Sequence, residues 1–177
     1  MPSTSTGTRK STARKTSASS AKMDAIKLLK QDHREVEELF DSFEKAKSDS
    51  PKQKIAMQIC EALKAHAAIE EEIFYPAARA EIENEEIMDE AQVEHNAAKQ
   101  LIAEIEQGPG DELWEAKVKV LGEYIRHHVK EEEGEMFKEV RATEMDLDAL
   151  GEQMMQRKQE LMAGAKDGKS ARSRASS

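Results

Sequence analysis

The sequence predicts an all-α protein: an up-and-down antiparallel four-helix bundle with an additional C-terminal helix and disordered tails. Its composition is typical of helical proteins, since only 8 of the 177 residues are Gly, 4 are Pro and 36% are charged. Apolar residues recur at helical period along four long segments. Four of the five histidines, one from each segment, follow one another at intervals of 33, 29 and 33 residues: His33, His66, His95 and His128. In antiparallel helices this spacing brings the four rings to one level.

The first two helices are expected in the N-terminal half of the chain. The first covers about residues 23–46, with an inward stripe that includes His33, Val36 and Phe40. After a break, Ser50 is expected to cap the second helix and Pro51 to occupy its first helical position. That helix carries His66 on its apolar stripe, and Pro76 marks its end or a kink near it.

Three further helices follow. The third is expected over about residues 84–107 and carries His95, and the break at residues 108–110 ends it. Asp111 is expected to cap the fourth helix, which carries His128. Asp146 is expected to cap a shorter fifth helix that ends near Ala163. This helix can bury its apolar side across the bundle or against a second copy, and we favour the bundle.

Charge marks the domain boundaries. Residues 1–22 have no acid and a net charge of +5, and residues 163–177 have a net charge of +3. Since the whole chain has a net charge of −9, residues 23–162 have a net charge of −17. Both ends are polar and low in complexity, which predicts disorder. We therefore expect a basic Ser/Thr-rich tail at 1–22, the bundle at 23–145, the C-terminal helix at 146–163 and a second basic tail at 164–177.

The tails and the composition also bear on location and partners. We interpret the N-terminal tail as a solubilising one, although an organellar transit segment and weak contact with nucleic acid remain open. No apolar run approaches the roughly 20 residues that cross a bilayer. The single cysteine, Cys60, excludes an internal disulfide. We expect a soluble cytoplasmic protein, a monomer or a weak dimer, without a membrane partner.

A glutamate follows three of the histidines by four residues, and residues so spaced share one helix face: Glu37, Glu70 and Glu132. Buried carboxylates and imidazoles cost several kcal/mol unless they are paired. A pair of cations would resolve this cost. Imidazole and carboxylate suit iron, manganese or zinc, and bridging carboxylates hold two ions about 3.5–4 Å apart.

Four stretches resemble the hemerythrin-like, HHE cation-binding domain family: DHREVEELF at 32–40, HAAIEEEIFYP at 66–76, VEHNAAK at 93–99 and HHVKEEEGEMF at 127–137. The resemblance implies a bundle that encloses two iron ions with carboxylate and oxo or hydroxo bridges. It further implies His33 and His66 as ligands of one iron, His95 and His128 as ligands of the other, and Glu70 and Glu132 as bridges.

Two positions leave alternatives open. The family's oxygen carriers have a histidine where this chain has Lys99, so Glu37, or less favourably Glu94, would have to complete the second iron. This departure argues against reversible oxygen carriage. In the fourth helix, His127 begins the same HxxxEEE string as His66, but His128 shares the apolar stripe and is favoured as the ligand. Tyr75 could donate a hydrogen bond near the site, but an ordinary core or boundary residue is the favoured interpretation.

Three functions are consistent with the sequence. The first is a di-iron protein that binds or senses oxygen, iron or redox state. The second is a di-iron enzyme that removes peroxide or nitric oxide, so whether the chain is an enzyme stays undecided. The third is a metal-free helical interaction protein whose basic tails bind nucleic acid. The small ligand expected for the first two is dioxygen, peroxide or nitric oxide.

Overall fold

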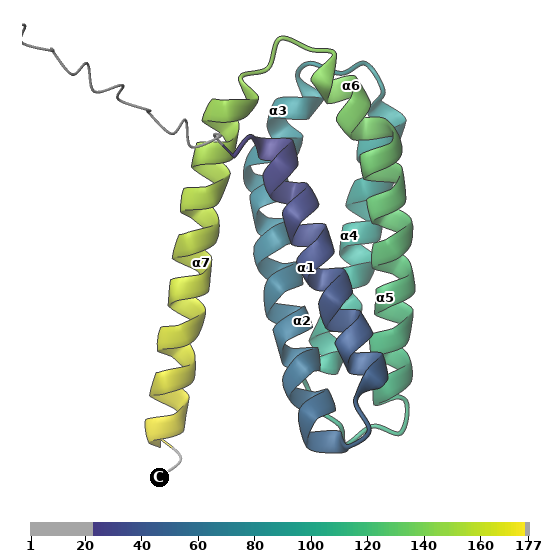
Figure 1. Ribbon diagram of the computed structural model, residues 1–177, viewed down its shortest axis with the longest axis vertical. Coiled ribbons are helices and arrows are strands. Elements are labelled where there is room, and N and C mark those ends of the chain that lie inside the picture. The colour runs from purple at the N-terminus through teal and green to yellow at the C-terminus, as the bar shows by residue number, and fades with distance from the viewer. Residues whose placement is uncertain (1–22, 176–177) are drawn as a thin grey trace, which may run out of the picture.

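The computed structural model describes residues 23–175, and within this range every regular element is a helix. Four helical rods run up and down as a bundle, and a fifth helix lies along one side of it (Figure 1). The predicted all-α bundle is confirmed. The basic tail at 1–22 lies outside the described residues. None of the described helices is long and apolar enough to cross a bilayer.

The first two rods are joined by a short turn. Helix α1 (Ala25–Lys45) is capped by Asp24, whose side chain accepts a hydrogen bond from the Lys27 backbone N–H at 2.9 Å. Helix α2 (Asp49–Ile69) starts earlier than predicted, because its N-cap is Ser48 and not Ser50. Pro51 therefore lies within the first turn, where its missing N–H costs no hydrogen bond.

Pro76 does not end the second rod. A π-helical turn, η1 (Glu70–Phe74), follows α2 directly, and α3 (Tyr75–Arg79) continues the rod. The fourth rod is built in the same way from α5 (Trp114–Glu131), η2 (Glu132–Met136) and α6 (Phe137–Arg141). Each π-turn holds one more residue than an α-turn, so residues five apart share a face there.

The third rod is the single helix α4 (Glu85–Ile105), which Asn84 caps through its side chain. The chain then turns at Gly108, whose φ of 95° suits glycine. The prediction that Asp111 caps the fourth helix is wrong, because α5 has Leu113 at its N-cap. The Asp111 carboxylate instead accepts from the Leu113 N–H at 2.8 Å in the preceding turn.

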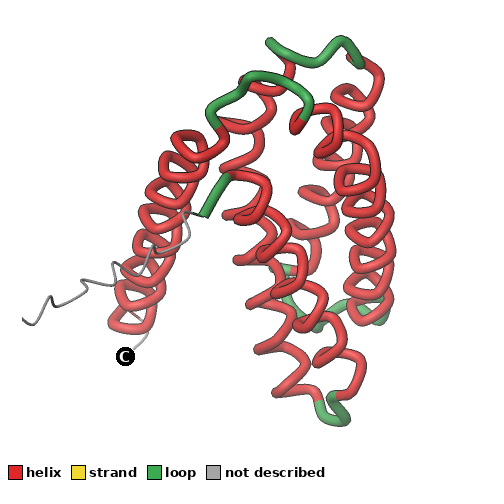
Figure 2. The backbone as a smooth tube through the Cα atoms, turned by 45° about the horizontal axis from the view of Figure 1, so that its top comes forward, coloured by secondary structure: helices red, strands yellow, loops and turns green. Residues whose placement is uncertain are grey.

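Helix α7 (Leu147–Ala175) is longer than predicted and continues through most of the segment expected to be disordered. The Asp146 side chain caps it by accepting from the Ala149 N–H at 2.9 Å. It packs against α1, α2 and η1, and Met154 is fully buried there. Figure 2 shows α7 lying beside the bundle and diverging from it toward the C-terminus.

The apolar core forms two clusters separated by a polar layer. One cluster lies where α1 begins and α3, α6 and α7 meet, and its members include Phe74, Phe137, Met136 and Met154. The other lies toward the α1–α2 and α4–α5 turns, and its members include Phe40, Phe43, Ile59 and Trp114. The predicted histidines occupy the level between the two clusters.

Candidate metal centre

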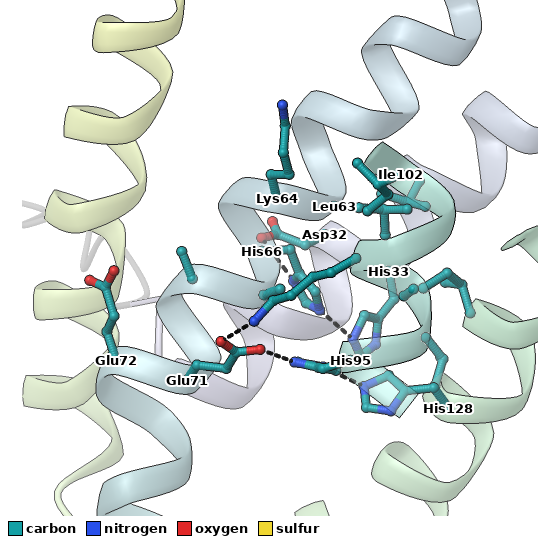
Figure 3. A pocket seen from close by; sticks show the side chains of 17 residues that line it. Asp32, His33, Leu63, Lys64, His66, Glu71, Glu72, His95, Ile102 and His128 are labelled. Carbon is teal, nitrogen blue, oxygen red and sulfur yellow. Dashed lines mark hydrogen bonds and ion pairs between the residues drawn. The ribbon is translucent and has the colours of Figure 1, made fainter. Parts of the chain in front are cut away.

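The four histidines on four different rods converge at one level of the bundle (Figure 3). The Nε2 atoms of His33 and His66 lie 3.1 Å apart, and those of His95 and His128 lie 3.3 Å apart. All four rings are buried. The histidines therefore form two pairs whose Nε2 atoms point toward a common interior space.

Glu70 and Glu132 lie between the two histidine pairs. The Oε1 atom of Glu70 is 3.0 Å from His66 Nε2, and its Oε2 atom is 3.4 Å from His95 Nε2. The Oε2 atom of Glu132 is 3.2 Å from His33 Nε2 and 4.0 Å from His128 Nε2. Each carboxylate thus reaches both pairs, which is the arrangement of a bridging ligand.

These donors fit a pair of cations. Both carboxylate oxygens of Glu70 and the Oε2 atom of Glu132 are fully buried and have no hydrogen-bond partner. A buried carboxylate without a partner is strongly unfavourable, and a metal ion removes that cost. Two groups of donors gather within 4.8 Å and share Glu70: His33, His66, Glu70 and Glu132 in one, and Glu70, His95 and His128 in the other.

Without a metal, protons supply the missing positive charge. Burial lowers the pKa of His66, but the carboxylates of Glu70 and Asp32 outweigh burial and raise that pKa to about 10. Burial also lowers the pKa of His128, but the hydrogen bond to Glu94 and the charge of Glu132 outweigh burial and raise it. Despite burial, these imidazoles hold the pKa of Glu70 far below its ordinary value.

Tyr75 contributes a further oxygen at the second histidine pair. Its hydroxyl lies 3.3 Å from both His95 Nε2 and Glu132 Oε1, and 3.5 Å from His128 Nε2. Burial and the nearby carboxylate of Glu132 raise the pKa of this hydroxyl well above its ordinary value. The interpretation of Tyr75 as an ordinary core residue missed this position. Because Tyr75 follows Glu70 by five residues, only the π-turn brings both to one face.

The profile of the hemerythrin HHE cation binding domain matches residues 24–140, which is well over half of the chain. The chain belongs to the hemerythrin HHE cation-binding family. A hemerythrin HHE cation binding domain-containing protein from Mycobacterium kansasii has a similar structure, with a TM-score of 0.68 and 24% sequence identity over 80% of this chain and 89% of that chain. This likeness supports the fold. No curated protein matches the chain significantly.

Each histidine of this hemerythrin-family domain is also held at its second ring nitrogen. The Nδ1 atoms of His33, His95 and His128 lie 2.8, 2.9 and 2.8 Å from carboxylate oxygens, and that of His66 lies 3.4 Å from one. The four partners, here called the supporting carboxylates, are Glu133, Glu71, Glu94 and Asp32, respectively. Such carboxylates fix the orientation and tautomer of metal-ligating imidazoles.

The structure does not bring Glu37 to the four histidines. Its exposed carboxylate instead pairs with Arg126, whose Nε atom lies 2.9 Å from Oε1. Glu37 has the same four-residue spacing from His33 as Glu70 has from His66, but Arg126 on α5 holds its carboxylate at the surface. Glu94, the weaker alternative, lies beside His128 as a supporting carboxylate.

The structure also shows where Lys99 and His127 lie. Lys99 does not reach the cluster and instead forms an ion pair with Glu71, the supporting carboxylate of His95. The side chain of His127 is 62% exposed and contacts Glu94 and Glu131 on the surface. Of the two adjacent histidines, therefore, the structure places His128 in the hemerythrin-type cluster.

A cavity of about 190 Å³ adjoins the four histidines on the side of the second apolar cluster. Its apolar lining includes Val36, Leu63, Ile102 and Ile125. Lys64 and Lys99 also line it, and both side chains are about half exposed, so the cavity reaches the surface between α2 and α4. A small, weakly polar molecule can reach the histidine level through it.

Proposed function

We propose that this domain holds a carboxylate-bridged di-iron centre. His33 and His66 would bind one ion, while His95, His128 and the Tyr75 oxygen would bind the other, with Glu70 and Glu132 shared. The single observation that carries the proposal is a set of three fully buried carboxylate oxygens that have no hydrogen-bond partner and face the Nε2 atoms of the two histidine pairs. The same observation argues against a metal-free interaction protein.

The donor set suits iron or manganese better than zinc, and we propose iron. Imidazole nitrogen together with carboxylate and phenol oxygen suits iron and manganese, whereas zinc sites are commonly closed by four ligands with sulfur or nitrogen. When bound, two iron ions would supply redox and Lewis-acid chemistry. The chain's own part is to hold the rings through the supporting carboxylates and to limit access to the apolar cavity.

We infer that the centre binds or senses a small ligand such as dioxygen, or responds to the redox state. The apolar cavity beside the histidines suits a diatomic or similarly small molecule. Tyr75, with its buried oxygen 3.3 Å from His95 Nε2, would supply a hard oxygen donor to an ion that lacks the extra histidine of the oxygen carriers, because that position is Lys99 here. Oxygen donors favour the ferric state, so a redox response fits the site better than reversible oxygen carriage.

Removal of peroxide or nitric oxide is the second candidate. The observation that favours it is the cavity between the histidines and the surface, which would admit either molecule. Oxygen evolution separates the two functions. An enzyme that disproportionates peroxide would evolve oxygen continuously when peroxide is in large excess, and one that removes nitric oxide would consume it over many turnovers, whereas a sensor would give a spectral change that stops after one equivalent.

Metal content tests the centre itself. We expect His66→Ala to lose stoichiometric iron, because His66 Nε2 lies in the cluster, 3.0 Å from Glu70. His127→Ala is the matched control and should keep most of the iron, because its ring is largely exposed. Elemental analysis of both purified variants gives the answer. Iron kept in the first variant and lost in the second would reverse the assignment.

A further inference from the structure

Helix α7 lies against α1 closely enough to place its side chains beside the metal centre. A Cβ atom at Gly151 would lie 2.4 Å from the Met23 carbonyl oxygen, so the two backbones touch at this point. Two helical turns further along α7, the Nζ atom of Lys158 lies 2.6 Å from Asp32 Oδ1 on α1. The close contact at Gly151 thus sets where Lys158 meets the bundle.

Asp32 connects this lysine to a histidine of the centre. The Asp32 side chain is only 4% exposed, and its second oxygen lies 3.4 Å from His66 Nδ1. The two oxygens of one buried carboxylate are therefore divided between Lys158 and His66. Among the described residues, Lys158 is the only lysine recorded in an ion pair with Asp32, and its removal would break that pair.

Two of the other supporting carboxylates obtain their cations from within the four-helix bundle, and the third has its neighbour there. Lys30 on α1 pairs with Glu133, and Lys99 on α4 pairs with Glu71. His127 on α5 contacts Glu94. Among the four, only the supporting carboxylate of His66 takes its cation from α7, which is outside the bundle.

We propose that Lys158 is a positioning residue for His66, through which the docking of α7 and the binding of metal at this centre support each other. The proposal rests on the di-iron centre proposed above. The lysine holds the Asp32 carboxylate in the position from which it orients the His66 ring. Loss of a group that orients a metal-ligating histidine typically weakens metal binding by about 10–100-fold.

The rate of metal release tests this role. Full-length protein is loaded with Fe²⁺ without oxygen, and release is followed with a chromogenic ferrous chelator. We expect Lys158→Met to release one of its two ions about tenfold faster than the wild type. Arg157→Met is the matched control: Arg157 also joins α7 to the bundle, by a pair with Glu72 at 2.7 Å, but Glu72 contacts no histidine of the centre. Its release rate should stay within about twofold, as for a surface ion pair.

Two further variants separate positioning from general stability. Lys158→Arg keeps the cation and should restore most of the slow release. In an Asp32→Asn background, Lys158→Met should have little further effect, because the lysine acts through that carboxylate. Equal effects of Lys158→Met in both backgrounds would overturn the proposal, as would equal effects of the Lys158→Met and Arg157→Met substitutions.

Coupling between two sites is reciprocal, so metal must also hold α7 in place. Amide hydrogen exchange around Lys158 should slow when Fe²⁺ is bound, and this difference should shrink in Lys158→Met. Failure of the two proposals is distinguishable. If the wild type retains no Fe²⁺, the proposed centre is wrong. If the wild type retains Fe²⁺ and Lys158→Met releases it at the same rate, only the role of α7 is wrong.

Discussion

At the scale of single residues, each histidine of the centre is fixed at both ring nitrogens. Nε2 points into the space that it shares with Glu70 and Glu132, and Nδ1 faces a supporting carboxylate. These carboxylates are themselves paired, so the ring orientations are set before any metal binds. Such preorganisation reduces the ordering that metal binding would otherwise require.

The proposed bond between Tyr75 and iron can be tested optically. A phenol oxygen bound to ferric iron gives a charge-transfer band in the visible region. We expect the oxidised wild type to show this band, and Tyr75→Phe to lose it while retaining both irons through the histidines and glutamates. Absorption spectra with parallel iron analysis measure both quantities. Tyr124→Phe is the control, because the residue is 50% exposed and should leave the spectrum unchanged.

Protonation of His66 links the stability of the metal-free protein to pH. Against the effect of burial, the carboxylates of Glu70 and Asp32 raise the pKa of this ring to about 10. A histidine in an unfolded chain titrates near about pH 6.5, so between that value and about pH 10 only the folded protein holds this proton. The free energy of unfolding should therefore fall as the pH rises across this range.

Urea unfolding of chelator-treated protein at about pH 7 and about pH 9.5 measures this decline. The metal-free His66→Ala variant should show a smaller decline, since the group that carries it is gone. Iron-loaded protein should also show a smaller decline, because the metal displaces the proton. A metal-free wild type that is equally stable at both values would contradict the linkage.

At the scale of elements, the two π-turns determine which residues face the centre. In a continuous α-helix a residue five positions after Glu70 would lie about 140° away from it, whereas the π-turn returns Tyr75 to the same face. The same holds for Glu132 and Phe137 across η2. Both proposed bridging glutamates therefore stand at the start of a π-turn.

The contact of α7 with α1 depends on a missing side chain. We expect Gly151→Ala to destabilise the protein by about 1–3 kcal/mol, because its Cβ would lie 2.4 Å from a backbone oxygen of Met23. Gly164→Ala, on the same helix with nothing within 4 Å, is the control and should be neutral or slightly stabilising. Thermal unfolding of both variants measures the difference. Equal stability of the two would show that α7 does not need this close approach.

At the scale of the whole molecule, the polar layer divides the core into two apolar clusters. All four rods contribute a histidine to this layer, so a metal pair would join them at the level where apolar packing is interrupted. A ligand that binds only the folded state stabilises it by about 2.7 kcal/mol at 100 times its dissociation constant.

We therefore expect iron to raise the Tm of the wild type and to have little effect on His66→Ala. Calorimetry with Fe²⁺ and with a chelator, at equal protein concentration and without oxygen, measures the two shifts. An equal rise in both proteins would place the stabilising iron away from the four histidines.

The sequence was sufficient to predict the bundle and the gathering of six side chains: His33, His66, His95, His128, Glu70 and Glu132. Helical period and matched spacing between turns determine which residues reach one level, and both are properties of the chain alone. Their role as ligands stays a prediction. Glu37 shows the limit of this reasoning, since its spacing matches that of Glu70 but the structure places it with Arg126.

Only the tertiary structure decided what surrounds those six side chains. The π-turn that brings Tyr75 inward leaves no period in the sequence, and Phe74 at its end packs against Phe137 of the fourth rod. The pairing of Lys158 with Asp32 joins residues far apart in the chain and requires α7 to dock on α1. Local geometry sets the level and face of a residue, whereas contacts between distant segments set its neighbours.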